Sequence, residues 1–118
     1  ILEAVKNVYN ERKIISVFEP HRYSRILTLK KDFAKSFSKS NLVLLCPIYA
    51  AGERKNSYFR IEEFGKLISK LSKTQVIIIK EYKEIEKYFK KNLINDEIII
   101  GMGAGKISKY MRDLKNYL

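Results

Sequence analysis

The chain has 118 residues, which suits one domain and is long enough to bury a core without disulfides or metals. Hydrophobic residues make up 46% and charged residues 31%, a balance that excludes disordered and collagen-like chains. Lys and Arg number 24 against 13 Asp and Glu, so the net charge is +11. That charge would attract nucleic acid, but the lysines are spread along the chain without a basic cluster interleaved with aromatics. We therefore do not expect nucleic acid as the main partner, and a stand-alone basic nucleic-acid-binding module remains the alternative.

The cysteine and histidine content limits the chemistry further. One cysteine, Cys46, allows no disulfide within the chain, and with one histidine it makes no metal-ligand cluster. We therefore expect a reducing compartment and no bound metal. No apolar run approaches the roughly 18 residues of a membrane span, and no signal peptide is visible. The chain opens at Ile1 inside a helical pattern, so residues 1–118 are expected to be one domain of a longer protein.

Four short apolar runs of strand length follow one another along the chain. None of them alternates polar with apolar residues, which is typical of strands buried on both faces of a parallel sheet. The runs are 14–18, 42–46, 75–79 and 97–100.

Segments with helical periodicity lie before, between and after these runs. Their apolar stripes are Leu2, Val5, Val8 and Tyr9; Ile26, Leu29, Phe33, Ala34 and Phe37; Ile61, Phe64, Gly65, Ile68 and Leu71; Ile85, Tyr88 and Phe89; and Ile107, Tyr110, Met111, Leu114 and Leu118. The alternation predicts a Rossmann-like α/β fold of three layers, with helices on both faces of a mainly parallel sheet. Ligands of such sheets bind beyond the carboxyl ends of the strands, so we expect functional residues in the loops after the four runs.

The first of these loops carries His21, Arg22 and Arg25. Arg25 falls near the start of the next helix, where a cation opposes the helix dipole. A bound carboxylate or phosphate would remove that conflict, since arginine forks and helix N-termini both suit such anions. The alternative is that both arginines lie in solvent or pair with Glu19 and Asp32.

The second loop contains Tyr49, two alanines, Gly52 and Glu53. Small residues allow close backbone approach, and glycine permits unusual backbone angles. Glu53 is one acid among basic neighbours. It could hold an ammonium group or orient an arginine of the first loop, and a surface salt bridge is equally compatible with the sequence.

The fourth loop is a glycine turn of Gly101, Gly103 and Gly105, followed by Lys106. A turn between a strand and a helix is the context of a phosphate loop, but neither the Walker nor the dinucleotide pattern is complete. Ile107 stands where a Walker loop has Ser or Thr, and Lys106 where a dinucleotide fingerprint has its third glycine. The turn could meet an anion through its N–H groups, or let the helix pack closely on the sheet.

The runs 17–25 (VFEPHRYSR), 49–53 (YAAGE) and 103–105 (GAG) together resemble the C-terminal domain of the UDP-N-acetylmuramate–L-alanine ligases. These are a Mur ligase family of peptidoglycan synthesis, and the resemblance extends along essentially the whole chain. Its most specific part is the His-Arg-Tyr-Ser-Arg run. The related muropeptide-recycling ligase, which adds a tripeptide to the same sugar, shares Phe-Glu-Pro and is the nearer alternative.

The resemblance implies a three-domain bacterial enzyme of the cytoplasm. An N-terminal domain binds the UDP sugar and a central P-loop domain binds ATP and Mg²⁺. A Rossmann-like C-terminal domain closes over the centre and brings the amino acid. The reaction is ATP-dependent amide formation, in which the amine of L-alanine attacks an acyl phosphate. This chain corresponds to the third domain alone, so we expect it to fold but to have no ligase activity by itself.

The same resemblance implies roles for individual residues. Arg25 would bind the L-alanine carboxylate, and His21 and Arg22 would face the acyl phosphate and the nucleotide. Tyr49 and Glu53 would line the alanine pocket. The glycines of the turn would be structural. Lys106 departs from the acidic or amide residue expected after the turn, and its role is left open.

Overall fold

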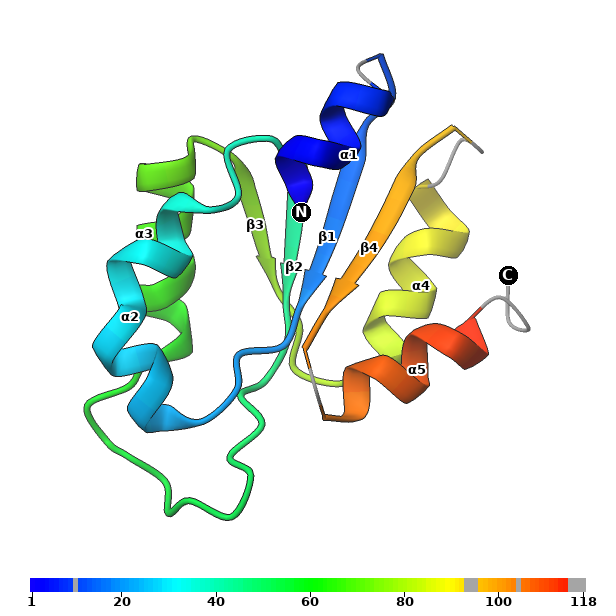
Figure 1. The fold of residues 1–118 in the computed structure, drawn as a ribbon. Helices are drawn as coiled ribbons and strands as arrows, with labels where there is room; N and C mark the ends of the chain where they lie inside the picture. Colours follow the sequence, from blue (N-terminus) through cyan, green and yellow to red (C-terminus); the bar gives the residue numbers. More distant parts are fainter. Residues whose placement is uncertain (10, 93–95, 104, 115–118) are drawn as a thin grey trace.

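The structure is a computed structural model, and it describes residues 1–9, 11–92, 96–103 and 105–114. In these residues helices and strands alternate in the predicted order (Figure 1). The elements are α1 (Leu2–Val8), β1 (Ile14–Phe18), α2 (Tyr23–Lys35), β2 (Leu42–Leu45), α3 (Ile61–Ser72), β3 (Gln75–Ile78), α4 (Lys83–Asn92), β4 (Ile98–Met102) and α5 (Lys106–Leu114).

The four strands form a parallel sheet in the order β3-β2-β1-β4. Ser16 in the centre of β1 faces Val43 of β2 on one side and Ile100 of β4 on the other. The chain therefore steps outward from β1 to β3 and then returns to lay β4 against the open side of β1. The reversal beside β1 is the switch point at which parallel α/β sheets bind ligands.

Helices cover both faces of the sheet, which confirms the predicted three layers. Helices α1, α2 and α3 lie on one face, and α4 and α5 on the other (Figure 1). Each face of the sheet has its own hydrophobic core, and alternate residues of β1 belong to one core or the other. Phe18 lies in the same core as Phe37 and Phe64. Val17 lies in the core that contains Leu44 and Phe89. The central strands β1 and β2 are buried throughout, while the edge strands β3 and β4 are mainly half-buried.

Three expectations were wrong, two of them from helical periodicity and one from the end of the fourth apolar run. Leu29 is exposed at a break in α2 (φ −108°, ψ 20°), although Ile26 before the break and Ala34 after it are buried. Val8 and Tyr9 are exposed because α1 ends at Val8. Gly101 lies inside β4, opposite Val17, and not in the turn that follows. Leu118, assigned to the last stripe, lies outside the described residues.

Candidate functional site

The loops after β1 and β2 are joined by backbone hydrogen bonds beyond the strand ends. The Tyr49 N–H donates to the Pro20 carbonyl and the Arg22 N–H donates to the Tyr49 carbonyl, each at 2.8 Å. The His21 and Tyr49 rings stack, with centroids 5.5 Å apart and planes 13° apart. The structure thus brings together His21, Arg22 and Tyr49, which the sequence placed in two separate loops.

Arg22 holds an unusual backbone conformation at the junction between β1 and α2. Its φ of 64° and ψ of 131° fall where residues with a Cβ rarely lie. Both its backbone groups are bonded, since its carbonyl accepts the Ile26 N–H at 3.2 Å and its N–H is held by Tyr49. The hydrogen bonds on either side keep the residue in this conformation, as is common where a fold directs a side chain toward a site.

Glu53 caps helix α2 from the neighbouring loop. Its carboxylate accepts hydrogen bonds from the Ser24 N–H at 3.1 Å and the Ser24 hydroxyl at 2.5 Å. These bonds, with a smaller contribution from the charge of Arg22, lower the pKa of Glu53. The first turn of α2 has no acid of its own, so Glu53 supplies the negative charge that a helix N-terminus favours. The sequence left three roles open for Glu53: binding an ammonium group, orienting an arginine, or forming a surface salt bridge. The helix cap is none of these three.

Arg25 extends from the first turn of α2 over the ring of Phe33, with the guanidinium carbon 5.6 Å from the ring centroid. Within the described ranges neither Arg22 nor Arg25 forms an ion pair with Glu19 or Asp32, so the pairing alternative was wrong. Arg25 is exposed, and a guanidinium in that state can accept a carboxylate or phosphate from outside the domain.

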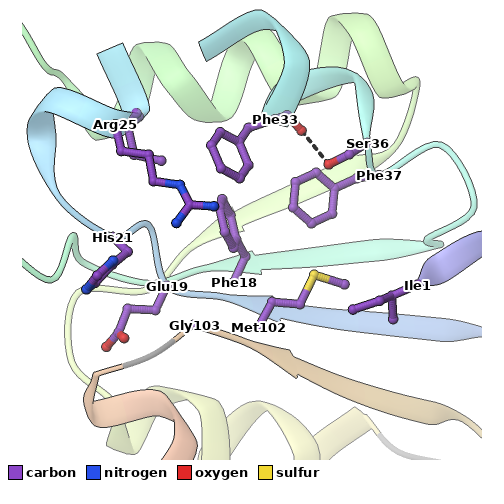
Figure 2. Close-up of a pocket in the computed structure, with 11 residues that line it drawn as sticks. Ile1, Phe18, Glu19, His21, Arg25, Phe33, Ser36, Phe37, Met102 and Gly103 are labelled. Carbon is purple, nitrogen blue, oxygen red and sulfur yellow. Dashed lines mark hydrogen bonds between the residues drawn. The ribbon is translucent and has the colours of Figure 1, made fainter. Parts of the chain in front are cut away.

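Arg25 and His21 stand at one end of a cavity of about 290 Å³ between α2 and the sheet (Figure 2). Phe18, Phe33 and Met102 form much of its apolar wall. A cavity with cationic and aromatic groups at its mouth and apolar walls behind suits a small organic anion.

Glu19 is the residue of this edge whose role the sequence did not reveal. It follows β1 directly and is only 1% exposed. One carboxylate oxygen accepts the Gly105 N–H at 2.9 Å, and the other accepts a short hydrogen bond from the Tyr82 hydroxyl. The available signal was an acid directly after a run that is apolar except for Ser16, since a carboxylate buried there would require hydrogen-bond donors.

The glycine turn packs tightly against Glu19 and Tyr49. Gly103 has φ 149°, and a Cβ on it would lie 2.6 Å from Ile107 Cγ2 and 2.9 Å from Glu19 Cβ. A Cβ on Gly105 would lie 2.5 Å from Tyr49 Cγ. The anion that this turn meets through the Gly105 N–H is the protein's own Glu19, and these contacts favour the packing interpretation.

Three further features bear on what the domain can bind. Burial, with a smaller effect from the charge of Glu19, raises the pKa of the Cys46 thiol to about 12. Among the residues that the structure describes, no group of three or more His, Cys, Asp or Glu side chains is placed to hold a metal. None of the described helices is long and apolar enough to cross a membrane.

No family model matches the chain. The chain is 40% identical over 114 residues to the UDP-N-acetylmuramate–L-alanine ligase of Pelagibacter ubique, covering 97% of this chain and 25% of the relative. The ligases of the same name from Caldanaerobacter subterraneus and Fusobacterium nucleatum are 38% and 34% identical. These matches cover 90% and 99% of this chain and 23% and 24% of the relatives.

The parallel α/β fold and these similarities identify a domain of the Mur ligase class. The chain belongs to the UDP-N-acetylmuramate–L-alanine ligase family and matches the C-terminal part of its members. It spans about a quarter of the length of the curated relatives. These relatives carry one name, so neither the recycling ligase nor the nucleic-acid module is favoured.

Proposed function

We propose that residues 1–118 are the amino-acid-binding domain of a bacterial cytoplasmic ligase that joins L-alanine to UDP-N-acetylmuramate. The observation that carries the proposal is Arg25, which lies beside His21 at a cavity mouth without an ion-pair partner among the described residues. A carboxylate at this point would be bound by the guanidinium and favoured by the N-terminus of α2. The name of the similar ligases supplies the amino acid, L-alanine.

The residues of this edge would hold the substrates in position for amide formation. Arg25 binds the carboxylate of L-alanine and leaves the amine free to reach the sugar-linked carbonyl. His21, stiffened by its stack on Tyr49, and Arg22 face the phosphate side and offset its negative charge. Closure of this edge over the reacting groups excludes water and raises their effective concentration.

ATP and Mg²⁺, when bound, supply the activation of the sugar carboxylate as an acyl phosphate. The described part of this chain gathers no set of metal-ligating side chains, so we assign the Mg²⁺ site to other parts of the complete ligase. UDP-N-acetylmuramate binding is assigned there as well. The partners of this domain are therefore L-alanine and the remaining domains of the same polypeptide.

The test is Arg25→Ala in the complete ligase. Loss of a charge-assisted pair should raise the KM for L-alanine and lower kcat/KM by on the order of 2–4 kcal/mol. Lys35→Ala, which removes an exposed cation from the last turn of α2, is the matched control and should leave alanine kinetics unchanged. Unchanged alanine kinetics in Arg25→Ala would refute the role of this residue.

A second measurement tests the assignment of the chain to one domain of a larger enzyme. The 118-residue chain alone, supplied with ATP, Mg²⁺, UDP-N-acetylmuramate and L-alanine, should release no phosphate and form no product. Product from the isolated chain would contradict the proposal that the ATP, Mg²⁺ and UDP-N-acetylmuramate sites lie in other parts of the ligase.

A further inference from the structure

The side chain and the main chain of Glu19 together connect the ends of three strands. Its N–H donates to the Met102 carbonyl at 2.9 Å, which extends the pairing of β1 with β4 by one residue. Its carboxylate accepts the Gly105 N–H from the turn after β4 and the Tyr82 hydroxyl from the loop after β3. Glu19 lines the cavity of Figure 2, but its carboxylate points away from it, toward the Gly105 N–H and the Tyr82 hydroxyl.

We propose that Glu19 is a positioning residue, which sets the loops of the ligand-binding edge by holding Gly105 and Tyr82 in place. This role rests on the proposed function only for its kinetic consequences. In this role the Glu19 carboxylate acts through the residues that it holds and not by binding substrate.

The path from Glu19 to the cationic residues is a short series of contacts. Gly105 lies so close to Tyr49 that any Cβ would collide with the ring. Tyr49 in turn stacks on His21 and bonds the Arg22 N–H through its carbonyl. A shift of Gly105 therefore removes the surface against which Tyr49 rests, and with it the support of His21 and Arg22.

The geometry of the hydrogen bonds, and not the charge, is the essential property in this role. A glutamine can keep both bonds, because its amide oxygen can accept the Gly105 N–H while its NH₂ donates to the Tyr82 oxygen. An alanine keeps neither and leaves the Gly105 N–H and the Tyr82 hydroxyl without their partner. Glu19→Gln removes the charge and keeps the two hydrogen bonds, whereas Glu19→Ala removes both, so the two variants distinguish the effect of the bonds from the effect of the charge.

The kinetic test uses the complete ligase with Glu19→Ala, Glu19→Gln and Tyr82→Phe. Misplacement by a fraction of an ångström to one ångström should lower kcat in Glu19→Ala on the order of tenfold to a hundredfold. Glu19→Gln should stay within about threefold of wild type, and Tyr82→Phe, which removes one of the two bonds, should fall between them. The KM for UDP-N-acetylmuramate should not change in any variant.

Ser72→Ala is the control for lost stability alone. The Ser72 hydroxyl is buried, donates to the Ala34 carbonyl and accepts the Phe37 N–H. It lies at the end of α3, before β3, and not in the loops that follow the strands. Its removal also leaves a buried backbone group without a partner, so unfolding should occur at lower denaturant while kcat stays unchanged. Equal kcat in Glu19→Ala and Ser72→Ala, or a loss in Glu19→Gln as large as in Glu19→Ala, would overturn the proposal.

A readout that needs no enzyme activity distinguishes this proposal from the proposed function. Amide hydrogen exchange of Arg22 in the 118-residue chain should accelerate on the order of tenfold or more in Glu19→Ala, and not in Glu19→Gln or Ser72→Ala. Unchanged Arg22 exchange in Glu19→Ala overturns the positioning role, whatever the ligase does. Should Glu19→Ala not fold, Tyr82→Phe is judged by the same measurements, and unchanged exchange and kcat in it are likewise the contrary result.

Discussion

Arg22 combines a side chain proposed to face the phosphate with a backbone angle better suited to glycine. Its φ of 64° at ψ 131° costs on the order of 1–3 kcal/mol for a residue with a Cβ. Arg22→Gly should therefore be more stable than Arg22→Ala by about 1 kcal/mol, after the entropy cost of glycine. Urea unfolding of the two variants measures the difference. Equal stability, or a more stable alanine variant, would contradict a strained Arg22.

The clustering of candidate site residues was predictable where the motif was local and not where contacts joined distant segments. His21, Arg22 and Arg25 stood out because they follow an apolar strand and precede a helix. Glu19 did not, because its hydroxyl partner Tyr82 is 63 residues away and no spacing rule connects them. The sequence suggested an arginine partner for Glu19 because one was nearby, whereas the fold supplied donors from two other loops.

The N-terminus of helix α2 is capped by the carboxylate of Glu53, which lies outside the helix, so the stability of the fold should depend on pH. The pKa of Glu53 is lower in the folded chain than its ordinary value of 4.5, because the Ser24 hydroxyl and N–H bond its charged form. The stabilisation is fully present above that value and disappears as the pH falls through the folded pKa. Glu53→Gln should therefore be less stable than wild type at about pH 7, with the difference shrinking below about pH 4.

Denaturant unfolding across that range, with Glu62→Gln as control, measures the effect. Glu62 is an exposed acid in the first turn of α3. Like Glu53 it interacts with a helix dipole, so Glu62→Gln measures the loss of that interaction without the loss of the Ser24 hydrogen bonds. A difference between wild type and Glu53→Gln that persists unchanged at low pH would argue against the cap.

Whole elements were predicted better than their ends. Apolar runs and helical stripes located all the strands and helices of the described residues in the right order. The misplaced Leu29 and Val8 have a common cause: periodicity assumes a continuous helix, and it contains no information about a break or an early end.

At the scale of the whole molecule, Cys46 reports on the integrity of the core between the sheet and helices α4 and α5. It is fully buried just beyond β2, in the core that α4 and α5 cover, and its pKa is about 12. The reactive thiolate is therefore scarce and shielded in the folded chain. Iodoacetamide at about pH 8 should label the native chain at least a hundredfold more slowly than the urea-unfolded chain. Comparable rates in the two states would contradict the buried position.

The parallel sheet itself followed from the apolar runs, but the strand order did not. Which open edge β4 would join was not encoded in any pattern, since both edges of a three-stranded sheet offer the same backbone groups. The outcome matters for the site, because only a β4 beside β1 brings Gly105 to Glu19.

That pairing also determines when the binding edge is completed during synthesis. Strand β1 leaves the ribosome before its partner β4, and the segments from α2 to α4 are made between the two. Until then Glu19 has neither the Gly105 N–H nor the Met102 carbonyl, and one edge of β1 is open to pairing with other chains. A polypeptide interrupted before β4 would keep the His-Arg-Tyr-Ser-Arg motif but not the contacts that shape it. The segment that contains β4 therefore completes contacts that the earlier β1 loop requires.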